Sequence, residues 1–279
     1  MALSIHSNAG ASFTVNQLRD IQKAFTESLE KIATGNRINK AADDASGMVI
    51  ADNLGLQARS LGQAIANAND AISMSQIADG ALEESAGIIN TIRTKAVQAS
   101  NGSQSMESRQ SIQNDIRKLV EQLDTIAQDT SYNNQKLLSG DFVNQSFQVG
   151  ANAGETITLS IGSAESSQLG DQELGRLSDI NVLTFEGAQA AIQISDAALE
   201  EVNSIRSEIG STQNQLTSTI SNLSTTHINV LSAESTIRDV DLAEESMNLS
   251  RLKRVSQARA YAAVKSNEQS NSIMKLLQG

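Results

Sequence analysis

Hydrophobic residues recur at intervals of three and four along most of this 279-residue chain, which is the spacing of helices that bury one stripe. Near the start, this spacing predicts a helix that ends at Gly35–Asn36, because these two residue types commonly end helices. Its apolar seam consists of Val15, Leu18, Ile21, Phe25, Leu29 and Ile32. A seam this narrow is typical of a helix that pairs with another helix.

Two more helices are predicted downstream of this break. Asp43, Asp44 or Ser46 can cap the first, because their side chains bind the free amide groups at a helix N-terminus. That helix extends to about Gln98, on the order of 80 Å in length, although Gly80 and Gly87 weaken the expectation that it is continuous. The next one has apolar residues at Ile112, Ile116, Leu119, Leu123 and Ile126, and a turn follows at residues 131–134.

The hydrophobic period changes from that of a helix to that of a strand between residues 142 and 162. Phe147 and Val149 alternate with polar residues, Gly150–Gly154 is rich in turn residues, and alternation returns at Ile157, Leu159 and Ile161. This pattern predicts a β-hairpin. Residues 162–183 are rich in Ser, Gly and Asp and predict a loop with little core.

Helical periodicity returns at Glu186 and continues to the end of the chain. The apolar residues Val202, Ile209, Leu216, Leu223 and Val230 are seven positions apart. Heptads sustained over this length predict a coiled-coil partner. The last helix is expected to begin at about Ser235, and its apolar residues include Ile237, Val240, Leu252, Val255, Ile273, Leu276 and Leu277.

These elements predict a mainly α protein with long antiparallel helices in a coiled coil or bundle and one small β-hairpin region. The order of elements is symmetrical: a helix and a break lie at each end, and long helices with a β insert lie between them. Each terminal helix has a seam that needs a partner. We therefore expect the two ends of the chain to pair with each other.

The composition excludes several classes of function. The net charge of −11 and the isoelectric point near 4.7 argue against nucleic acid or an anionic membrane as a partner. The chain has no cysteine, so a disulfide or a cysteine-ligated zinc is impossible, and it has no proline to interrupt its helices. No secretory signal pattern and no run of about 20 apolar residues is present, and composition alone favours a cytoplasmic protein.

Candidate catalytic and metal-binding residues are few. The two histidines, His6 and His227, are far apart, and neither has a second histidine or a glutamate at the spacing of metal ligands. A structural or solvated role is therefore favoured for His227, which lies on the heptad helix. The sequence has no phosphate-binding loop, dinucleotide fingerprint or nucleophile elbow. It predicts no cofactor, no metal and no catalytic site, and hence a protein that is not an enzyme.

Two kinds of charged cluster have a structural and a functional interpretation. Asp43 and Asp44 could act as paired acid–base carboxylates, but their place at the start of a helix favours capping and contacts at a joint. The same holds for Asp239 and Asp241. A basic cluster, Arg251, Lys253, Arg254 and Arg259, could bind nucleic acid, but the acidity of the whole chain favours a solvated or inter-subunit charged face.

Both ends of the sequence resemble bacterial flagellins. Residues 34–47, TGNRINKAADDASG, and residues 67–73, NANDAIS, resemble the N-terminal signature of that family. Residues 233–245, AESTIRDVDLAEE, and the Leu276–Leu277 ending resemble the C-terminal one. Residues 137–146, LLSGDFVNQS, are similar to flagellins of the Campylobacter kind.

The resemblance implies a structural subunit that self-polymerises into the flagellar filament for motility. Residues 1–42 and 236–279 would form an inner coiled-coil domain, with Arg37, Asn39, Asp43 and Asp44 at its joint. Residues 43–235 would form an outer tube domain with the hairpin at about 142–162 and no additional outer domain. The apolar residues of the two terminal helices would pack in the inner core and between subunits.

The resemblance also implies partners and a location. Family members leave the cell unfolded through the flagellar type III export apparatus, so a secreted, extracellular protein is expected instead of a cytoplasmic one. Its partners would be copies of itself, the hook-associated junction and cap proteins, and an export chaperone. Where many flagellins carry a Gln-Arg pair and a nearby Leu for toll-like receptor 5, this chain has Asn90, Thr91 and Lys95. Weak receptor recognition is therefore expected, since an Arg anchor is missing.

Three alternatives to the filament subunit are compatible with parts of this pattern. A hook–filament junction protein of related fold shares the terminal pattern but assembles into a short ring. A filament-associated enzyme would need a catalytic insert, for which residues 162–185 leave no room. An adhesin or receptor ligand could be a side role of the polymer surface.

Overall fold

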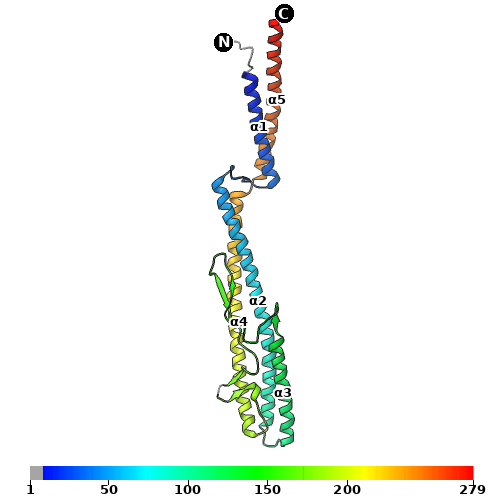
Figure 1. Cartoon of the computed structure of the whole chain (residues 1–279), viewed down its shortest axis with the longest axis vertical. Coiled ribbons are helices and arrows are strands. Elements are labelled where there is room, and N and C mark those ends of the chain that lie inside the picture. Colours follow the sequence, from blue (N-terminus) through cyan, green and yellow to red (C-terminus); the bar gives the residue numbers. More distant parts are fainter. Residues whose placement is uncertain (1–8, 172, 279) are drawn as a thin grey trace. The chain divides into compact units, whose positions relative to one another are not determined.

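The computed structural model describes residues 9–171 and 173–278, without the side chains of residues 9, 269–271 and 273–278. The described residues form five α-helices (Figure 1): α1 (Ala9–Thr34), α2 (Ala45–Ala99), α3 (Met106–Asp129), α4 (Phe185–Arg238) and α5 (Leu242–Gln278). Gly80 and Gly87 do not interrupt α2, and a Cβ at either position would meet nothing within 4 Å apart from the adjacent backbone of α2 itself. The prediction of a mainly α fold with a small β region is confirmed.

Short antiparallel hairpins lie between α3 and α4. The expected hairpin is formed by β3 (Gln145–Gln148) and β4 (Thr156–Leu159), with Phe147 opposite Ile157. Two smaller ones, whose strands are too short to show alternation in the sequence, pair β1 with β2 and β5 with β6. These strands are β1 (Ser131–Tyr132), β2 (Gln135–Lys136), β5 (Gly170–Asp171) and β6 (Gly175–Arg176).

The chain divides into two compact units. We call the described part of Met1–Ala58 and Ile228–Gly279 the terminal unit, and Arg59–His227 the central unit. These bounds differ from those expected for the inner and outer domains, because the first turns of α2 and the last turns of α4 belong to the terminal unit. The division into an inner and a tube domain stays a prediction.

One hydrophobic core holds the central unit together. It joins α2, α3 and α4 through fully or nearly fully buried side chains such as Leu82, Ile116 and Ile194. A smaller cluster packs the β3–β4 hairpin against α2 and α4, with Ala68, Val149, Ile157 and Leu216 at its centre. An ion pair at 2.8 Å between Arg206 in α4 and Asp79 in α2 lies beside the core and raises the pKa of Arg206.

The segment 162–183 contributes to this core, so the prediction of a loop with little core is wrong. Its buried apolar residues are Ala164, Leu169, Leu177, Ile180 and Val182. They follow neither helical nor strand periodicity, which is why the sequence pattern does not reveal them. Gln113 in α3 holds the segment in place: its amide donates to the carbonyl of Ile180 at 2.9 Å and accepts from the amide of Val182 at 2.7 Å.

The break between α4 and α5 lies later than expected. The sequence predicted a helix start at about Ser235, whereas α4 continues to Arg238 and α5 begins at Leu242. The cap is provided by Asp241, whose Oδ1 accepts from the amides of Ala243 at 2.8 Å and Glu244 at 3.1 Å. Several residues near Ser235 are suitable caps, so composition alone does not identify the one that is used.

Candidate assembly interface

Exposed apolar side chains are concentrated in the terminal unit. Among the described residues, 12 of the 18 exposed large hydrophobic side chains belong to it, but only 4 of the 39 buried hydrophobic residues. Those four are Ile38, Ala51, Ala58 and Ala263. The exposed ones are Phe13, Val15, Leu29, Val49, Ile50, Leu56, Ile228, Leu231, Leu242, Met247, Tyr261 and Val264. The terminal unit therefore has almost no core of its own.

The terminal helices α1 and α5 lie side by side (Figure 1). The residues predicted for this seam are half-buried in the single chain: Leu18, Ile21, Phe25 and Ile32 in α1, and Leu252 and Val255 in α5. Leu29 is 43% exposed. Ile237 at the end of α4 and Val240 in the break are half-buried as well. The side chains of Ile273, Leu276 and Leu277 lie outside the described residues. Pairing within one chain thus covers the seam only in part.

Two polar contacts fix the register of α1 against α5. The hydroxyl of Ser28, which is 2% exposed, donates to Oε1 of Glu245. Farther along, the guanidinium of Arg259 donates to the carbonyl of Gln17 at 3.0 Å. Both contacts connect residues far apart in sequence, so periodicity could not predict them.

The two breaks at the helix ends are hydrogen-bonded to each other. Asn36 and Asp239 form an antiparallel β-bridge, in which the amide of Arg37 donates to the carbonyl of Arg238 at 2.6 Å. The guanidinium of Arg37 also donates to the carbonyl of Ile237 at 2.6 Å. These bonds form a joint in which the residues just after α1 are tied to those just before α5.

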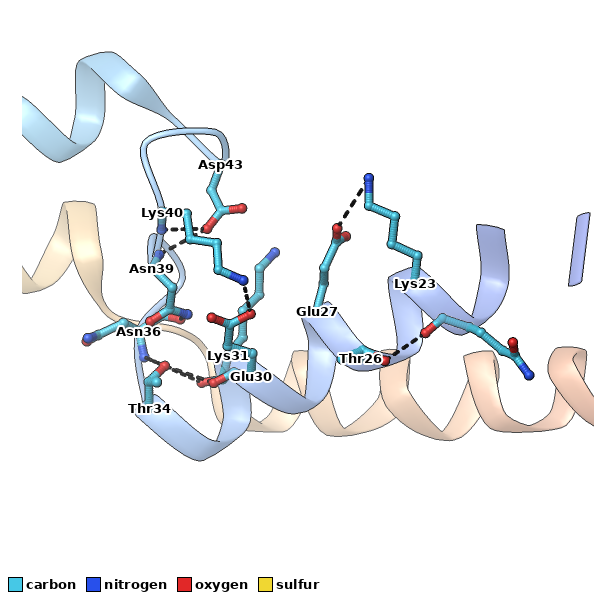
Figure 2. A network of polar contacts seen from close by, with 11 residues as sticks. Lys23, Thr26, Glu27, Glu30, Lys31, Thr34, Asn36, Asn39, Lys40 and Asp43 are labelled. Carbon is cyan, nitrogen blue, oxygen red and sulfur yellow. Dashed lines mark hydrogen bonds and ion pairs between the residues drawn. The ribbon is translucent and has the colours of Figure 1, made fainter. Parts of the chain in front are cut away.

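A carboxylate organises the chain between α1 and α2 (Figure 2). Oδ2 of Asp43 accepts hydrogen bonds from the backbone amides of Asn39 and Lys40, both at 3.0 Å. These two bonds, and the one from Asn39 most strongly, lower the pKa of Asp43. The ammonium group of Lys40 lies 2.5 Å from Oε2 of Glu30 in α1, and this bond raises the pKa of Lys40. The side-chain amide of Asn39 donates to the carbonyl of Asn36 at 3.0 Å.

The next carboxylate, Asp44, caps α2. Its Oδ1 accepts from the amide of Gly47 at 2.9 Å. Gly47 has no space for a side chain, because a Cβ there would lie 2.8 Å from Cδ1 of Ile38 and closer still to the Asp44 carboxylate. Sequence reasoning proposed Asp43, Asp44 or Ser46 as the cap, and the geometry assigns the cap to Asp44 and a turn-forming role to Asp43.

One ion pair at this joint was not predicted. The guanidinium of Arg238 lies 2.9 Å from Oδ1 of Asp52 in α2 and 3.3 Å from Oε1 of Glu234. Only the second of these is a helical i, i+4 pair that a sequence pattern could indicate. The pair connects the end of α4 to the start of α2, and both helices flank the joint.

Asn90, Thr91 and Lys95, which occupy the positions where many flagellins carry residues for toll-like receptor 5, lie in the central unit. Asn90 and Thr91 are exposed on α2. Lys95 is less exposed, because its ammonium group lies 2.7 Å from Oδ2 of Asp115 in α3. This ion pair lowers the pKa of Asp115. Lys95 is therefore already engaged within the chain.

Metal sites and membrane spans are not found in the described residues. In this part of the chain, no group of three or more His, Asp or Glu residues is arranged to hold a metal ion. None of the helices within residues 9–278 combines the length and the apolar character needed to cross a lipid bilayer.

Comparison with known proteins identifies the family. Residues 5–143 match the model of the bacterial flagellin N-terminal helical region, and residues 192–277 match that of the C-terminal helical region. Flagellin A of Helicobacter felis is 46% identical over 72% of this chain, but the match covers only 40% of that relative, so the chain spans less than half of its length.

Two other known proteins match this chain over nearly their whole length. The flagellar filament 33 kDa core protein of Treponema phagedenis is 32% identical, and the match covers 98% of this chain and 99% of that protein. A solved structure from Vibrio parahaemolyticus, described as a putative flagellar hook-associated protein, is 15% identical with a TM-score of 0.60, over 71% of this chain and 100% of the other. At this identity, it indicates a shared fold alone. The family models and the full-length relative show that this chain belongs to the bacterial flagellin family.

Proposed function

We propose that this chain is a structural subunit, not an enzyme, that self-polymerises into a bacterial flagellar filament for motility. The observation that carries the proposal is the terminal unit, which exposes most of its large apolar side chains and has almost no core. Exposed apolar surface costs about 25 cal/mol per Å², so these side chains favour a partner surface. Membership of the flagellin family makes other copies of the same chain the partner.

Assembly would order the ends of the chain. An isolated helix with one apolar stripe is marginal in water, because most helical stability in proteins comes from packing. We therefore expect residues 1–42 and 236–279 to be largely disordered in the free monomer. In the polymer they would form the inner coiled-coil domain, with residues 43–235 as the outer tube domain. A contact between two different surfaces that does not close on itself generates a helical filament.

The same proposal includes the location and the other partners. The filament lies outside the cell, so the subunit would be secreted through the flagellar type III export apparatus with an export chaperone. Junction and cap proteins would contact the two ends of the filament. The absence of Cys and Pro supports this route, because no disulfide and no slow X-Pro isomerisation can delay folding after export.

Recognition by toll-like receptor 5 is proposed to be weak. Interface hot spots are enriched in Arg, and this surface of α2 carries Asn90 and Thr91 instead. The nearby Lys95 is paired with Asp115 in the same chain, so contact with a receptor would have to compete with that ion pair. A reporter-cell assay with purified protein tests this point, and potent signalling would contradict it.

Circular dichroism of the monomer and the filament tests the proposed function. Dilute wild-type monomer should have clearly less helix than the filament, and purified protein should grow into micrometre-long filaments rather than short rings. Variants that lack residues 1–42 or 236–279 should not polymerise, while their remaining helices still unfold cooperatively. A truncated variant that grows filaments, or a monomer as helical as the filament, would refute the mechanism.

A further inference from the structure

α5 has a second face that no other part of the described chain covers. Its residues follow heptad steps of three and four, and all are exposed: Glu244, Met247, Arg251, Arg254, Ala258, Tyr261, Lys265 and Glu268. We call this face the outer α5 seam. Residues three and four apart in a helix lie on one side of it. A different side of α5, roughly a third of a turn away, carries half-buried residues such as Leu252 and Val255, and α5 packs against α1. Thus α5 has two seams, and one chain uses only one of them.

The outer α5 seam contains large apolar groups that favour burial. Met247 is 68% exposed and Tyr261 is 67% exposed. The ammonium group of Lys265 lies 5.9 Å from the centre of the Tyr261 ring, within the range of a cation–π contact. Apolar and charged residues that alternate at heptad spacing are typical of a helix face that contacts another helix.

The charges along α5 are separated. Between Glu245 and Glu268 the sequence has five basic residues and no acidic one. Of these, Arg251, Lys253 and Arg254 have no ion pair within the part of the chain that the structure describes. The acidic residues gather instead just before the helix, at Asp239 and Asp241, and in its first turn, at Glu244 and Glu245.

These two charged zones cannot neutralise each other within one molecule. Their centres are about two heptads apart, which corresponds to ~20 Å along a helix. The Debye length at physiological ionic strength is only ~8 Å, so the attraction between them is screened. A second copy displaced along the helix axis by this distance would place its acidic zone beside the basic zone of the first.

We propose that the outer α5 seam binds the outer α5 seam of a neighbouring copy, parallel and displaced by about 20 Å along the helix axis. Copies related by rotation and translation along one filament axis have the same polarity, so a parallel contact is the one a helical polymer permits. The proposal rests on the proposed filament function and adds the surface and the axial offset of one contact. A nucleic acid is a poorer occupant, because it would also face a chain with a net charge of −11.

The displacement of two heptads makes specific pairs. Met247 of one copy faces Tyr261 of the next, which permits a sulfur–aromatic contact. Glu244 of one copy lies level with Ala258 of the next, one helical turn (~6 Å) from Arg254, which the two long charged side chains can span. Charge pairs of this kind contribute more to the choice of register than to affinity, so they select the offset between copies while the apolar side chains contribute the burial.

Disulfide cross-linking tests this register. Because the chain has no native cysteine, only the introduced cysteines can form disulfides. In filaments of the M247C/Y261C variant, oxidation should link successive copies into a ladder of covalent multimers. Within one chain the two positions are ~20 Å apart along α5, far beyond the roughly 4.4–6.8 Å between Cα atoms that a disulfide permits. The control is M247C/V264C, because Val264 is also exposed on α5 but lies off the seam. Filaments without a ladder, or an equal ladder in the control, would overturn the proposal.

Charge reversal tests the same register independently, even if the cysteine variants do not polymerise. Glu244→Arg and Arg254→Glu should each raise the critical concentration for polymerisation at least about tenfold at low salt, or about 1.4 kcal/mol. The double variant should return it to within about threefold of wild type, because the pair is restored between copies. As a control, Lys118→Glu on α3 should change the critical concentration by less than about twofold. Single variants that polymerise like wild type, or a double variant without rescue, would contradict the inference. Failure of wild type itself to polymerise would instead refute the proposed function.

Discussion

The hydroxyl of Ser28 in α1 donates a hydrogen bond to the carboxylate of Glu245 in α5, at a point where Ser28 is almost completely buried. The contact joins the two ends of the chain along the seam between α1 and α5. Asn248 supports it by donating its side-chain amide to the same carboxylate oxygen at 3.1 Å. A buried hydroxyl with a carboxylate partner constrains how one helix slides along another, because any shift would leave the donor unpaired.

Ser28→Ala is expected to weaken this pairing by about 1 kcal/mol, since it removes one hydrogen bond and leaves the rest of the seam intact. Filaments of the variant should depolymerise several degrees below wild-type filaments, as followed by light scattering on heating. Ser12→Ala, at an exposed position of the same helix, should leave the midpoint unchanged. Equal midpoints for Ser28→Ala and wild type would show that the contact does not form in the polymer.

Gly47→Ala is expected to disrupt the joint, because the new methyl group would collide with Ile38 and with the Asp44 carboxylate that caps α2. Loss of the cap alone costs about 1 kcal/mol, and the variant should polymerise at a higher critical concentration. Gly80→Ala is the matched control, since its methyl group meets nothing and raises helix propensity. Gly80→Ala should therefore raise the midpoint temperature of thermal unfolding of the monomer. A Gly47→Ala protein that polymerises like wild type would contradict the assigned packing.

Gln113→Leu is expected to destabilise the central unit by about 2–4 kcal/mol, because it leaves the Ile180 carbonyl and the Val182 amide without partners in a buried place. Urea unfolding of the monomer, followed by circular dichroism, measures this change. Gln110→Leu lies on the exposed side of α3 and should change the free energy of unfolding by less than about 0.5 kcal/mol. Similar values for the two variants would show that Gln113 does not hold the segment.

The helices and the main hairpin could be predicted from the sequence, because their apolar residues repeat at a fixed period. The heptad residues Val202, Ile209 and Leu216 are indeed buried. The same reasoning failed for residues 162–183, whose five buried apolar residues have no period because the backbone there is mostly irregular. Periodicity reports regular backbone geometry, so it does not reveal a core built from loops.

The contacts of the joint were less predictable than its location. The signature residues Arg37, Asn39, Asp43 and Asp44 mark where the chain turns, and the structure gives each a hydrogen bond there. Their partners could not be inferred, because Ile237 is 200 positions from Arg37 and no local pattern connects them. The Asp52–Arg238 ion pair was missed for the same reason.

Acid is expected to destabilise the central unit in part through Asp115. The ion pair with Lys95 lowers the pKa of Asp115 in the folded protein, so the folded state binds its proton less readily than the unfolded state does. This contribution is complete above the unfolded pKa of about 4 and is lost as pH falls through the folded pKa. Asp115→Asn should therefore lower stability at pH ~7 but flatten its decline between about pH 5 and 2 in urea titrations. Lys95→Met should have the same effect, since it removes the other partner. Acid profiles parallel to wild type in both variants would show that other carboxylates cause the acid sensitivity.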